Sequence, residues 1–84
     1  MSEVVDNAEA ARYEIRVDGR LAGVLEYRRS DGVVDLFHTE VEPELRKRGL
    51  GAELVHHALD DARRRNERII PTCPFVAAML SGSW

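Results

Sequence analysis

The spacing of apolar residues changes once along this chain, from every second residue to the spacing of a helix. Before Pro43, apolar and polar residues alternate, most clearly over residues 13–17, which is typical of strands with one wet face. After Gly51, apolar residues recur with helical spacing as far as Ala62, and the helix should extend to about Arg65. The chain therefore predicts strands followed by a helix in one small α+β domain.

Three strands should precede the helix and form an antiparallel meander. We expect them over residues 12–17, 21–29 and 33–41, because the turn sequences Asp18-Gly19 and Ser30-Asp31-Gly32 separate them. Glycine accepts the positive φ that such turns require. Strands that are joined by tight turns can only pair antiparallel.

A second part of the sheet should follow the helix. Residues 68–72 read as a short strand, and Pro74 should open a last helix over residues 75–80. The third strand, the helix and this fourth strand form a β-α-β crossover, which makes the two strands parallel. The predicted order is β-β-β-α-β-α in a single domain over residues 1–84, with residues 1–11 as a flexible, acidic lead-in.

Charge and cysteine content exclude several classes of protein. The formal net charge of −3 argues against a general nucleic-acid binder, which needs a basic excess. The single cysteine cannot form an internal disulfide, so we expect a reducing, cytoplasmic location. No apolar run approaches the roughly 20 residues that cross a bilayer, and we expect no membrane association.

The junction between the third strand and the helix is the most informative segment. Residues 46–51, Arg-Lys-Arg-Gly-Leu-Gly, place two glycines and three cations just before the helix. Glycine lets the backbone approach a ligand closely, and the free amides of a helix start bind phosphate. Cations there oppose the helix dipole, and this conflict points to a bound polyphosphate. The segment is neither a Walker A loop, since no Gly-Lys-Ser/Thr follows, nor a Rossmann fingerprint, since Leu54 stands at the third glycine position.

Three segments together resemble one family. Residues 46–52 resemble the Q/R-x-x-G-x-G/A pyrophosphate loop of the GNAT superfamily of N-acetyltransferases. With residues 37–41 and 70–76 they resemble its small stand-alone YjdJ-type members, over residues 13–80 in all. The resemblance implies binding of acetyl-CoA, with the pantetheine along the third strand and the pyrophosphate on the loop amides. The implied cofactor-binding residues are Val41, Arg46, Lys47, Arg48, Gly49, Leu50, Gly51 and Ala52.

The single cysteine, Cys73, lies between the fourth strand and the last helix. A lone cysteine is usually a small buried apolar residue. A helix N-terminus, however, lowers the pKa of a thiol, and His38 near the end of the adjacent strand could act as its base. The resemblance places a histidine and a cysteine at these positions as the suspected catalytic pair. Covalent transfer through an acetyl-cysteine and a simple proton relay both remain open.

Two further sets of polar residues are simpler to interpret. Glu40 and Glu42 share one strand face, where they could hold or activate an amine, although solvated carboxylates are the more ordinary interpretation. His56 and His57 are adjacent on the helix, so their side chains point about 100° apart and cannot both face one metal. We expect no metal.

The sequence therefore predicts an acetyl-CoA-dependent N-acetyltransferase. The acetyl group would lie between His38 and Cys73 and pass to an unidentified amine, which could belong to another protein. Two alternatives remain: a CoA-binding module without catalysis, and a small interaction domain whose basic loop contacts an acidic partner. An exposed sheet edge in so small a chain predicts a monomer or a weak homodimer.

Overall fold

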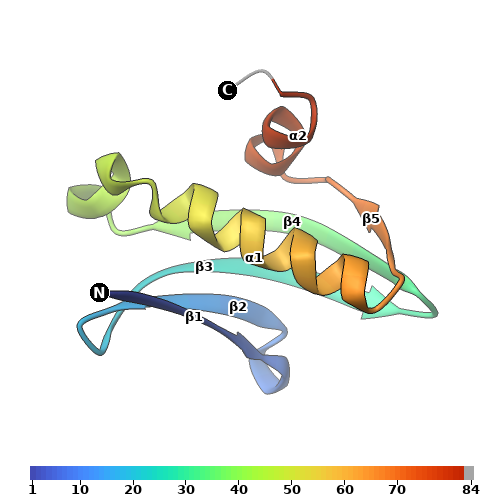
Figure 1. Cartoon of the computed structure of the whole chain (residues 1–84), viewed down its shortest axis with the longest axis horizontal. Coiled ribbons are helices and arrows are strands. Elements are labelled where there is room, and N and C mark those ends of the chain that lie inside the picture. The colour runs from blue at the N-terminus through green and yellow to red at the C-terminus, as the bar shows by residue number, and fades with distance from the viewer. Residues whose placement is uncertain (83–84) are drawn as a thin grey trace.

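The computed structural model describes residues 1–82, except for the side chain of Lys47. Helix α1 lies across one face of a five-stranded sheet, and α2 follows β5 and packs against β4 (Figure 1). The strands are β1 (Ser2–Asn7), β2 (Arg12–Val17), β3 (Arg20–Ser30), β4 (Val33–Val41) and β5 (Arg68–Ile70). The helices are α1 (Leu50–Arg64) and α2 (Pro74–Leu80), with short 3₁₀ helices η1 (Ala8–Ala10) and η2 (Pro43–Arg48). Within the described residues, neither α-helix has the length and apolar character to span a bilayer.

The sheet has the strand order β1-β2-β3-β4-β5, with β4 and β5 parallel and all other neighbours antiparallel. The predicted α+β class, the meander and the β-α-β crossover are confirmed. Pairing between β4 and β5 extends only from Val33 opposite Arg68 to Asp35 opposite Ile70. Strand β4 continues to Val41, so its second half has a backbone edge that β5 does not cover.

The expectation that residues 1–11 form a flexible lead-in is wrong. Strand β1 pairs with β2 along its whole length, from Ser2 opposite Val17 to Asn7 opposite Arg12. It is the edge strand of the sheet, so the predicted meander has one strand more than expected.

Polar contacts explain why the apolar pattern did not reveal β1. Val4 packs against the core, but its neighbours on the same side of the strand are polar. The hydroxyl of Ser2 donates to Glu53 at 2.6 Å, and Asp6 accepts a hydrogen bond from the hydroxyl of Tyr27 at 2.6 Å. These partners lie far away in the sequence, so local periodicity carries no sign of them.

The apolar stripe predicted for α1 is confirmed, and it builds the core. Its buried residues pack on the sheet face that carries the apolar side chains of β2, β3 and β4. The helix residues are Leu50, Leu54, Val55, Ala58, Leu59 and Ala62, and those of the sheet include Tyr13, Ile15, Leu25, Val34 and Leu36. This packing fixes the start of α1 beside the end of β4.

A β-bulge in β4 decides which side chains of its second half face the core. Leu36 pairs with Tyr27, but the preceding residue of β3, Glu26, pairs with His38, so Phe37 is the extra residue. Beyond the bulge, side chains again alternate between the two faces of the sheet, and His38 lies on the exposed one.

A polar cluster lies around Arg29, on the side of the sheet covered by α1. The guanidinium donates from Nε to Glu67 Oε2 at 2.6 Å and from Nη2 to the hydroxyl of Tyr13 at 2.8 Å. That hydroxyl in turn donates to Asp61 at 2.6 Å. Burial, together with the hydrogen bond to Asp61, raises the pKa of Tyr13. The cluster joins the end of α1 to β2 and β3.

Candidate functional site

A cleft of about 460 Å³ lies between the uncovered edge of β4 and the starts of α1 and α2. Its lining residues are His38, Thr39, Glu40, Val41, Arg46, Gly49, Gly51, Ala52 and Phe75. Five of the residues predicted to bind the cofactor are in this set: Val41, Arg46, Gly49, Gly51 and Ala52. The strand-loop-helix motif therefore does line one concave surface.

The other three predicted residues differ in their position. Leu50 is only 4% exposed and belongs to the core, so only its backbone can face a ligand. Arg48 is exposed at the end of η2, outside the cleft lining. The side chain of Lys47 lies outside the described part of the chain.

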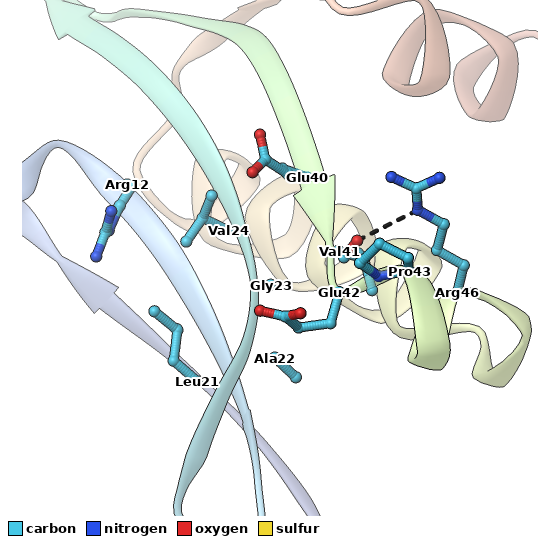
Figure 2. A pocket seen from close by; sticks show the side chains of 10 residues that line it. All are labelled: Arg12, Leu21, Ala22, Gly23, Val24, Glu40, Val41, Glu42, Pro43 and Arg46. Atoms are coloured by element: carbon cyan, nitrogen blue, oxygen red, sulfur yellow. Dashed lines mark hydrogen bonds between the residues drawn. The ribbon is translucent and has the colours of Figure 1, made fainter.

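The start of α1 combines a glycine turn, free backbone amides and a nearby cation. Gly49 has a φ of 74° and ends η2 where α1 begins, a conformation that favours glycine. The N-cap residue is Gly49, and no described side chain caps this helix start, so the amides of its first turn remain available to a ligand. Arg46 donates from Nε to the carbonyl of Val41 at 3.3 Å, which holds a cation beside the end of β4 (Figure 2).

Gly51 of α1 lies close to the ring of Phe75 in α2. A Cβ at this position would lie 3.1 Å from the ring of Phe75, closer than most real Cβ contacts. A side chain here would displace the ring that forms the apolar wall of the cleft. Phe75 lies in the segment 70–76 that resembles the family, but no role was predicted for it. Its contact with Gly51 depends on how the two helices pack.

Cys73 immediately precedes α2 and contacts Thr39, a residue of the cleft wall. Its Sγ lies 3.4 Å from Thr39 Oγ1, and its amide donates to the carbonyl of Leu36 at 2.9 Å. The thiol is 5% exposed, and burial alone would raise its pKa. Hydrogen bonds with the Thr39 hydroxyl and with the amides of Val76 and Phe75 outweigh burial, so the pKa of Cys73 is lowered. Thr39 is the functional candidate that the sequence did not single out.

His38 lines the cleft but does not approach Cys73 as a hydrogen-bond partner. Its side chain is 48% exposed, and Nε2 lies 3.1 Å from Glu40 Oε1. Successive side chains of a strand point to opposite faces, so His38 faces away from the side on which Thr39 meets the thiol. Within residues 1–82, no hydrogen bond joins the two members of the predicted catalytic pair.

The lowered pKa of Cys73 gives a direct prediction. In the folded chain, the ultraviolet absorbance of the thiolate should titrate at a lower pH than in the same chain unfolded by urea. Replacing Thr39 with valine removes one hydrogen bond to the sulfur and should move the midpoint upward. Equal midpoints for the folded and unfolded chain would contradict the stabilisation of the thiolate.

The comparisons with known proteins agree with this geometry. Residues 12–83 match the family model described as GCN5-related N-acetyl-transferase, and the chain belongs to this family of N-acetyltransferases. A GCN5-like protein from Staphylococcus aureus is 27% identical, with a TM-score of 0.71 over 95% of this chain and 78% of that one. Ard1 from Thermoplasma volcanium shares the fold, with 19% identity and a TM-score of 0.63 over 74% of this chain. This alignment spans 42% of the Ard1 chain. No curated protein matches.

Proposed function

We propose that this chain binds acetyl-CoA in the cleft beside β4 and transfers the acetyl group to an amine, as a small YjdJ-type member of its family. The observation that carries the proposal is the shared lining of this cleft by the β4 edge and the glycine loop. The single cysteine of the protein, Cys73, is free, and a free thiol suits a reducing compartment. We therefore place the protein in the cytoplasm.

The described residues suit such a ligand in two ways. Between Leu36, whose carbonyl accepts from the Cys73 amide, and Val41, whose carbonyl accepts from Arg46, the backbone groups on the edge of β4 that β5 does not cover can pair with the amides of a pantetheine arm. At the other end of the cleft, Arg46 and the first amides of α1 suit a pyrophosphate. The exposed side chain of Arg48, at the end of η2, adds to the positive potential near this end.

The chemistry proposed for the protein centres on Cys73. Bound acetyl-CoA supplies an activated thioester. The Cys73 thiolate forms a bond to the acetyl carbon, and the bond from that carbon to the sulfur of CoA breaks. The amine then attacks the acetyl group on Cys73, which restores the thiolate. His38 lines the same cleft from the opposite face of β4 and accepts, through solvent, the proton that the amine loses. This proton balances the charge with which CoA leaves.

Calorimetric titration with acetyl-CoA tests the first half of the proposal. Arg46→Glu places a carboxylate beside the expected phosphates, so we expect at least about tenfold weaker binding, the loss of one charge-assisted hydrogen bond. Arg63→Glu is the matched control, because Arg63 is 68% exposed near the far end of α1 and should leave the affinity unchanged.

Two outcomes would count against the proposal. No binding at millimolar acetyl-CoA would refute it. Equal losses of affinity in both variants would show that the position of Arg46 beside the cleft does not matter. If CoA also failed to raise the melting temperature, the reading as a small interaction domain would gain.

A further inference from the structure

We propose that the acceptor is a primary amine with a second positive charge, and that it occupies a separate cleft at the end of β4. This inference rests on the proposed acetyl transfer and specifies its substrate class. The cleft has a volume of about 310 Å³ and is formed by β2, β3 and the end of β4 (Figure 2). Its lining residues are Arg12, Leu21, Ala22, Gly23, Val24, Glu40, Val41, Glu42, Pro43 and Arg46.

This second cleft adjoins the proposed acetyl-CoA cleft. Glu40, Val41 and Arg46 line both of them, so the end of β4 is their common wall. Glu40 also bonds His38, which we propose as the proton acceptor. An acceptor in the second cleft can therefore extend along β4 from Glu42 past Glu40 and bring its reacting nitrogen to the part of the acetyl-CoA cleft lined by His38 and Thr39.

The charges of the second cleft favour a cation. Glu42 is exposed, and its carboxylate forms no hydrogen bond or ion pair with any described side chain. Arg12 is held by Glu14, with Nε 2.8 Å from Oε2, and Arg16 shares that carboxylate at 3.3 Å. In Figure 2, Glu42 points toward β3, whereas Arg46 extends on the other side of the strand end. On the β3 side of the strand end, the Glu42 carboxylate is therefore available to a cation.

The spacing along the strand sets the length of the acceptor. A strand rises about 3.3 Å per residue, so Glu40 lies about 7 Å and Glu42 about 13 Å along the chain from His38. If the reacting nitrogen lies at His38, a second ammonium on a spacer of butane length or longer reaches one of these carboxylates. A simple monoamine gains neither contact. Spermidine and two neighbouring lysines of a peptide share the required chemistry.

A competition between amines tests the substrate class. We expect spermidine and N-acetyl-Lys-Lys-amide to be acetylated with higher kcat/KM than n-butylamine, and the better of the two identifies the source of the acceptor. Glu42→Gln should lower this preference about fivefold, the upper range for an exposed ion pair. High salt should lower it too. Glu44→Gln is the control, because Glu44 is a nearby carboxylate outside the lining of this cleft.

Equal kcat/KM values for the monoamine and the charged amines would overturn the inference, as would equal effects of the two variants. A binding measurement separates this failure from a failure of acetyl transfer. In the CoA-saturated protein, spermidine should shift the amide NMR signals of Gly23, Val24 and Glu42. The absence of such shifts at millimolar spermidine would overturn the inference even if acetyl-CoA binds and Cys73 is acetylated.

Discussion

Replacing Arg29 with methionine is expected to lower the free energy of unfolding by about 3–5 kcal/mol, the cost of removing one partner from a buried ion pair. Arg29 is 16% exposed and its partner Glu67 is 6% exposed. The second oxygen of Glu67, Oε1, is buried and has no hydrogen-bond partner within the described residues. Without Arg29, neither oxygen of this carboxylate would be compensated.

The expected loss is large for a chain of 84 residues, whose total stability should be about 4–13 kcal/mol. Urea unfolding monitored by circular dichroism measures it. Arg28→Met is the matched control, since Arg28 is exposed and its guanidinium lies 4.4 Å from the centre of the Phe37 ring. It should cost no more than about 1 kcal/mol. Similar losses in both variants would mean that Arg29 is not the centre of a buried network.

Replacing Cys73 with alanine is expected to reduce acetyl transfer at least about a thousandfold, as the loss of a covalent nucleophile does. Acetyl-CoA affinity should change little, because the expected binding contacts are made by the cleft lining, which Cys73 adjoins only through Thr39. After incubation with acetyl-CoA, mass spectrometry should find one acetyl group on the peptide containing Cys73 of the native chain and none in the variant.

Two other results would revise this scheme in different ways. Turnover that persists in Cys73→Ala would mean that the acetyl group passes directly to the amine, with the thiol at most a proton relay. Binding of acetyl-CoA with neither acetylation of Cys73 nor turnover of any amine would instead favour a CoA-binding module without catalysis.

Much of the fold was predictable because its signals are local. The long helix was expected from Gly51 to about Arg65 and extends from Leu50 to Arg64. Apolar periodicity and turn glycines also located the strands from Arg12 onward. Strand β1 was missed because its inner side carries two polar residues, Ser2 and Asp6. Their partners lie far away in the sequence, on α1, on β3 and at Arg65 just after α1. Such contacts exist only after the chain has folded.

The site residues also include some that were predictable from local sequence and some that depend on the folded structure. Gly49 was predictable because a tight turn before a helix favours glycine, and Arg46 and Gly51 because their spacing from it resembles the pyrophosphate loop of the family. Leu50 was included with them, although helix packing turns its side chain into the core. The contact of Thr39 with Cys73 was not predictable, since the bulge at Phe37 decides which β4 side chains meet the thiol.

The short pairing of β5 with β4 leaves backbone groups of the sheet to be paired by a ligand. After Ile70 the chain turns away, and the hydrogen-bonding groups of β4 up to Val41 have no neighbouring strand on that side. A pantetheine arm would occupy the place of the missing strand. Bound acetyl-CoA would then supply hydrogen-bond partners to the edge of β4, and each release of product would leave that edge unpaired until the next molecule binds.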